Sequence, residues 1–61
     1  MMMSMNVMLH PGCVLPDYTT PITYISGLDI HIVTIKEEDY DRIKTDPAVR
    51  LVEYNHQVEV T

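Results

Sequence analysis

Residues 52–60 alternate strictly between two sets of side chains. One set is Val52, Tyr54, His56, Val58 and Val60, and the other is Glu53, Asn55, Gln57 and Glu59. Successive side chains of a β-strand point to opposite faces, so this alternation predicts a half-buried strand. Val49 and Leu51 are out of phase with the pattern, which predicts a bend or bulge near residues 51–52.

A β-hairpin is expected upstream of this strand. Residues 22–25 and residues 28–33 are rich in β-branched and aromatic side chains, which suit a pleated strand. Ser26-Gly27 between them predicts a tight turn and antiparallel pairing. Three aliphatic residues share one face of the second strand: Leu28, Ile30 and Ile32.

A short helix is expected between the hairpin and the final strand. Thr34 is placed to cap it, and Glu37 three residues later completes the pattern of a capping box. Asp46 precedes Pro47 and is therefore disfavoured in helical conformation, so the helix is expected to end near Lys44 or Thr45.

Residues 1–21 have the least regular pattern. Pro11-Gly12 predicts a turn, and Pro16 and Pro21 bracket an expected loop. We therefore expect a poorly structured or short-hairpin segment over residues 1–21 and a β-β-α-β module over residues 22–61. This is an α+β architecture, a small antiparallel sheet with one helix.

The size of the chain limits its hydrophobic core. It has 61 residues, with four tyrosines and no tryptophan or phenylalanine. A domain of this size gains only about 3–5 kcal/mol net from its core. Dimerisation or binding to another protein is therefore an expected source of additional stability.

Charge argues against some partner classes. Nine acidic and four basic residues give a net charge of −5. Phosphate-rich nucleic acids and anionic membranes both select for clustered Lys and Arg, so neither is an expected partner. The chain has no basic segment followed by an apolar run, as in a signal peptide, and no apolar run of about 20 residues. Its single cysteine, Cys13, favours a reducing, cytoplasmic setting.

No arrangement typical of an enzyme or metal site is present. Cys13 with His31 or His56 would supply a nucleophile and a base, but no spacing supports that pair. His10 and Cys13 flank a turn, and the other two histidines could complete a tetrahedral metal set, although a second cysteine is missing. We therefore expect no enzymatic activity, metal or cofactor, and we interpret the acidic residues 37–41 as a solvated helix face.

Several short segments in the C-terminal half resemble the subtilisin-type propeptides. These segments are Thr34-Ile35-Lys36-Glu37, Arg42-Ile43-Lys44, Asp46-Pro47-Ala48-Val49, Val52-Glu53 and His56. Members of that family act as intramolecular chaperones and inhibitors of subtilisin-like serine proteases. The resemblance covers residues 28–61, a little over half of the chain, and its most specific part is Asp46 to Glu53.

The resemblance implies a fold, a partner and a binding surface. The family fold is ferredoxin-like, β-α-β-β-α-β, so this chain is expected to form half of it, without the first strand-helix unit. In the family, the sheet packs on protease helices and the C-terminal tail enters the active-site cleft. The implied partner-binding residues are Val52, Tyr54, His56, Val58, Glu59, Val60 and Thr61. The implied structural motif comprises Thr34, Glu37, Asp46, Pro47 and Val49.

A second hypothesis belongs to another functional class. A long terminal strand on a small core is prone to pair with a second copy along its edge. The alternative is therefore a small self-associating structural or regulatory protein, of the kind that viruses and mobile elements encode.

Overall fold

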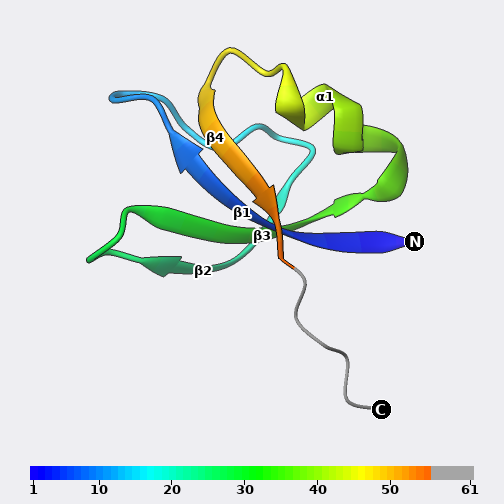
Figure 1. Cartoon of the computed structure of the whole chain (residues 1–61), viewed down its shortest axis with the longest axis horizontal. Coiled ribbons are helices and arrows are strands. Elements are labelled where there is room, and N and C mark those ends of the chain that lie inside the picture. The colour runs from blue at the N-terminus through cyan, green and yellow to red at the C-terminus, as the bar shows by residue number, and fades with distance from the viewer. Residues whose placement is uncertain (56–61) are drawn as a thin grey trace.

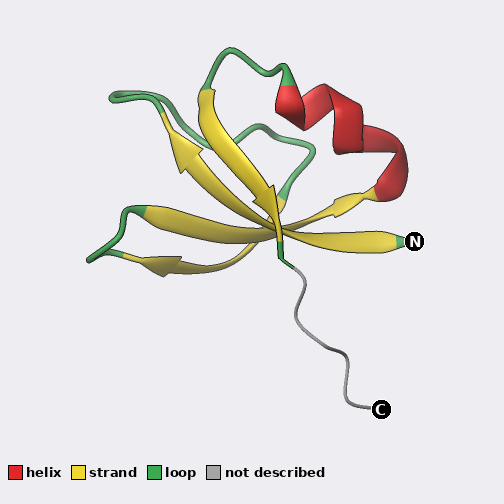
Figure 2. Cartoon of the chain, in the orientation of Figure 1, coloured by secondary structure: helices red, strands yellow, loops and turns green. Residues whose placement is uncertain are grey.

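A single four-stranded antiparallel sheet carries the fold. The computed structural model describes residues 1–55. Its elements are β1 (Met2–Leu9), β2 (Thr20–Ile25), β3 (Ile30–Lys36), the 3-10 turn η1 (Glu37–Asp39), α1 (Tyr40–Lys44) and β4 (Val49–Tyr54). The strand order is β2-β3-β1-β4, and α1 lies to one side of the sheet (Figures 1 and 2). The expected α+β class is confirmed.

Strand β1 lies inside the sheet, between β3 and β4. Met5 and Val7 are fully buried and belong to the core, while Ser4 and Asn6, which alternate with them, face the other way. The expectation of a poorly structured or short-hairpin segment over residues 1–21 is therefore wrong. Met8 adds an apolar side chain to the outward set, so the alternation of this strand was hard to see in the sequence.

The sheet contains one strand more than the expected β-β-α-β architecture, and this strand, β1, determines the strand order. Strand β1 separates β3 from β4, so β3, α1 and β4 form a split β-α-β unit. Strand β3 in turn separates β1 from β2. This is the strand arrangement of a ferredoxin-like sheet. The first strand is present, contrary to expectation, and only the first helix is missing.

Residues 10–19 occupy the place of that helix. The expected turn at Pro11-Gly12 is confirmed: Gly12 has a φ of 80°, and the Cys13 amide donates to the His10 carbonyl over 3.1 Å. Leu15 and Tyr18 pack against the core from this loop. The loop therefore covers the same side of the sheet as α1.

The hairpin formed by β2 and β3 is confirmed. Its turn is longer than expected, because Leu28 donates to the Ile25 carbonyl and Asp29 to the Ser26 carbonyl. Asp29 has a φ of 54°, a left-handed conformation that aspartate tolerates better than most residues. The residue with positive φ in this turn is therefore Asp29. In the expected tight turn at Ser26-Gly27, that residue would have been Gly27.

Thr34 belongs to β3 and does not cap the helix, so that expectation is wrong. It pairs with Ser4 on one side and Thr20 on the other. The strand continues because Ile35 is fully buried in the core, and neither η1 nor α1 has a side-chain cap. The expected end of the helix is confirmed, since α1 stops at Lys44.

Strand β4 contains the expected bulge. Leu9 pairs with Val49 and Met8 with Leu51, so Arg50 is the extra residue, one position before the expected site. The final strand was expected to run to Val60. The structure gives β4 as Val49–Tyr54, and residues 56–61 lie outside the described part of the chain.

The core consists of five fully buried side chains: Met5, Val7, Val33, Ile35 and Ile43. Strands β1 and β3 contribute two each, and Ile43 is the buried residue of α1. A core this small matches the marginal stability that the length predicts. Within residues 1–55, neither helix has the length and apolar character needed to cross a membrane.

Candidate functional site

The candidate site is the uncovered face of the sheet. Directly paired strand residues share a face, so the register assigns each side chain to one side. Six apolar side chains lie opposite the core: Met2, Met8, Ile25, Ile30, Ile32 and Leu51. The polar side chains among them are Ser4, Asn6, Thr20, Thr23, Thr34, Lys36 and Glu53. We call this surface the open face, because α1 and the loop of residues 10–19 both lie on the other side in the described structure (Figure 1).

The open face is divided into an apolar end and a polar end. Ile25 pairs with Ile30, and Met8 pairs with Leu51, giving an apolar row across all four strands. Hydroxyl groups form the second row, where Thr34 pairs with both Ser4 and Thr20. The surface is thus of mixed polarity, which is typical of protein interfaces that form and dissociate.

Asn6 lies between these two rows, near the centre of the open face. It pairs with Ile32 on one side and Glu53 on the other. Its Oδ1 atom is buried and has no hydrogen-bond partner among the described residues. A buried acceptor without a partner costs about 1–3 kcal/mol, so an additional donor at this position would be favourable.

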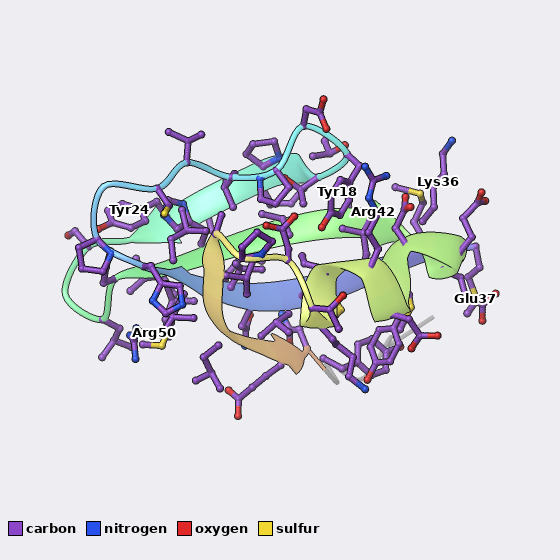
Figure 3. All side chains as sticks on the ribbon, turned by 90° about the horizontal axis from the view of Figure 1, so that it is seen from above. Tyr18, Tyr24, Lys36, Glu37, Arg42 and Arg50 are labelled. Atoms are coloured by element: carbon purple, nitrogen blue, oxygen red, sulfur yellow. The ribbon has the colours of Figure 1, made fainter. Side chains whose placement is uncertain are left out.

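Charge is distributed unequally between the two sides of the sheet. Lys36 and Glu53, of opposite sign, are the charged residues that the strand register places on the open face within residues 1–55. Arg50 lies at its rim, where Nη2 approaches Met8 Sδ at 3.4 Å, and Figure 3 shows Lys36 at the opposite end. Five acidic residues instead follow β3, in η1, α1 and the turn after it: Glu37, Glu38, Asp39, Asp41 and Asp46. The open face is consequently close to neutral.

The predicted partner-binding residues fall on the other side or outside the described structure. Val52 pairs with Val7 and packs against the core, so its side chain contributes to the interior. Tyr54 pairs with Met5 on the same side and remains 39% exposed. The remaining five, His56, Val58, Glu59, Val60 and Thr61, lie outside the described residues.

Asp46 ties the loop of residues 10–19 to the turn before β4. Its Oδ1 accepts from the Ala48 amide and its Oδ2 from the Tyr18 hydroxyl, both over 2.9 Å. The Val49 amide donates to the Asp46 carbonyl over 3.0 Å. The guanidinium of Arg42 lies 4.0 Å from the centre of the Tyr18 ring. Figure 3 labels both side chains. The Asp46-Pro47-Ala48-Val49 segment is therefore a hydrogen-bonded turn that starts β4.

Stability at high pH is expected to depend on Tyr18. Burial and the hydrogen bond to Asp46 together raise the pKa of its hydroxyl to about 12, and burial is the larger cause. Because the folded pKa exceeds the unfolded value of about 10, the stabilisation is complete below pH ~10 and is lost as pH rises toward 12. Tyr18→Phe should lower the free energy of unfolding by about 1 kcal/mol at neutral pH and flatten this alkaline decline.

Urea unfolding between neutral and strongly alkaline pH would measure both effects. Tyr24→Phe is the matched control, since the Tyr24 hydroxyl also donates to a carboxylate, Asp29 Oδ1, at 2.7 Å. That hydrogen bond raises the pKa of Tyr24, but the pair is exposed, so its loss should change stability less. Equal effects of the two substitutions would contradict the role assigned to Tyr18.

An open pocket of about 370 Å³ lies where β1 ends, beside the hairpin. His10, Cys13, Asp29, His31 and Arg50 are among its lining residues. The His31 ring contacts that of Tyr24, with 4.5 Å between the ring centres. The pocket brings together three of the residues considered for metal binding, yet no group of three or more ligating side chains within residues 1–55 could hold a metal ion.

Comparisons with protein-family models, curated proteins and solved structures found no match to this chain. The residues and geometry of the open face are therefore the basis for proposing a function. Within the described residues, the open face combines an apolar row, a row of hydroxyl groups and a buried acceptor without a partner.

Proposed function

We propose that this chain is a protein-binding module that docks a folded partner on its open face, and that the partner is a subtilisin-like serine protease. The observation that carries the docking proposal is a sheet with one side packed on α1 and the other side holding six apolar side chains. The resemblance of residues 28–61 to subtilisin-type propeptides supports the choice of partner.

The fold supports the same proposal. In subtilisin-type propeptides the sheet of a ferredoxin-like domain packs on helices of the protease. Here the strand order is β2-β3-β1-β4, as in a ferredoxin-like sheet. The missing first helix would have been on the covered side. Its replacement by residues 10–19 leaves the open face unchanged. By the resemblance, residues 58–61 would then enter the active-site cleft, where an extended segment binds through its main chain.

Leu51→Glu should weaken inhibition of a subtilisin-type protease about tenfold or more, because it introduces a charge into the apolar row of the interface. Leu51 is 47% exposed, so the folded monomer tolerates this change. The measurement is the inhibition constant of the full chain and of a version ending at Gln57, each with and without the substitution.

Leu28→Glu is the matched control. Leu28 is 60% exposed and lies in the hairpin turn, so the same change in charge falls outside the open face. Its inhibition constant should equal that of the unmodified chain. Absence of inhibition at micromolar concentration by the unmodified chain would overturn the choice of partner.

A further inference from the structure

We infer that in the absence of a partner the open face binds the open face of a second copy, forming a two-fold symmetric dimer of stacked sheets. This inference uses the same surface as the proposed function but does not depend on the identity of the protease. It also differs from pairing along a strand edge, because the two sheets would meet face to face.

The charge distribution favours a second copy as the occupant. The chain has a net charge of −5, so most approaches between two copies are repulsive. Stacking open face on open face is the exception. It brings together surfaces on which Lys36 offsets Glu53, and it directs the acidic residues of η1 and α1 away from each other.

The size of the face is sufficient for a weak dimer. Four strands spaced by about 4.8 Å and six residue steps of about 3.3 Å give roughly 400 Å² of flat sheet per copy. Side chains project from the sheet and increase its accessible area. Two stacked copies would therefore bury roughly 1,200 Å² in total, at the lower limit for specific complexes. We therefore expect a dissociation constant in the micromolar range.

Asn6 gives the dimer a specific centre. A two-fold axis through the middle of the open face places Asn6 of one copy close to Asn6 of the other. Each side chain can then donate from Nδ2 to the opposite Oδ1, after rotation about its soft terminal torsion. This pairing would supply the donor that Asn6 Oδ1 lacks among the described residues. Paired asparagines set the partner and alignment in coiled coils in the same way.

Sedimentation velocity of the full chain tests the inference. The sedimentation coefficient should rise from monomer to dimer between about 10 µM and about 500 µM, the range that brackets a micromolar constant. Leu51→Glu should weaken association at least tenfold, and Leu28→Glu should leave it unchanged. A monomer over the whole range, or equal weakening by both variants, would overturn the inference. A chain that dimerises but does not inhibit a protease supports this inference and overturns the proposed partner.

Cross-linking tests the position of Asn6 separately. Cys13 is the only cysteine, so Cys13→Ser combined with Asn6→Cys leaves a single thiol on the open face. Stacked sheets lie about 10 Å apart, too far for a direct disulfide but within reach of a short bis-maleimide. This variant should give a covalent dimer, whereas Cys13→Ser with Leu28→Cys should not. Equal yields from both variants would overturn the two-fold stacking.

Discussion

Ile43→Ala is expected to remove most of the free energy of unfolding at 25 °C and to leave a large fraction of the molecules unfolded. Ile43 is fully buried and is the one residue of α1 in the core cluster. Shortening a buried isoleucine to alanine destabilises a protein by about 2–5 kcal/mol, because it removes buried area and leaves a cavity. A domain of this length has only about 3–5 kcal/mol in total, so the substitution removes most of it.

Far-UV circular dichroism and urea titration would measure this loss. Ile22→Ala is the matched control, because Ile22 carries the same side chain on β2 but is 60% exposed. Its free energy of unfolding should change by less than about 0.5 kcal/mol. If the two variants unfolded at the same urea concentration, α1 could not be an essential cover of the sheet.

The class of the fold was predictable because the C-terminal elements have clear local patterns. The hairpin, the helix stop at Asp46-Pro47 and the bulge in the final strand all follow from short-range chemistry. The position at which β3 ends could not be predicted from such short-range patterns. Thr34 and Glu37 match a capping box, but extension of the strand buries Ile35 in the core, and this outweighs a cap.

The candidate site was less predictable than the fold. In β3 the aliphatic residues occupy both faces, with Ile30 and Ile32 on one and Val33 and Ile35 on the other. Alternation alone does not say which set a helix will cover. In β4 the bulge at Arg50 shifts the pattern, and it sets Val52 inward and Leu51 outward. The outward apolar residues of the four strands were therefore the available signal, and they are recognisable as one surface only once the sheet is assembled.

Removal of residues 1–21 is expected to abolish folding altogether. The alternating pattern made residues 22–61 look like a self-sufficient module, but β1 pairs with both β3 and β4 and joins them into one sheet. Without it, β4 has no strand partner among the described residues, and the core loses Met5 and Val7. A two-stranded hairpin with a short helix is at best marginally stable in water. The amide resonances of a chain of residues 22–61 should collapse into the narrow range of an unfolded peptide.

Val7→Asp in the full chain tests the contribution of β1 without shortening the chain. Val7 is fully buried, so the new carboxylate would lie in the core without a partner and should unfold the protein. Thr23→Asp places the same group on the exposed strand β2, where dispersion of the amide resonances should be retained. Well-dispersed amide resonances from residues 22–61 alone would show that β1 is dispensable. The open face would then have to be redefined without Asn6 and Met8.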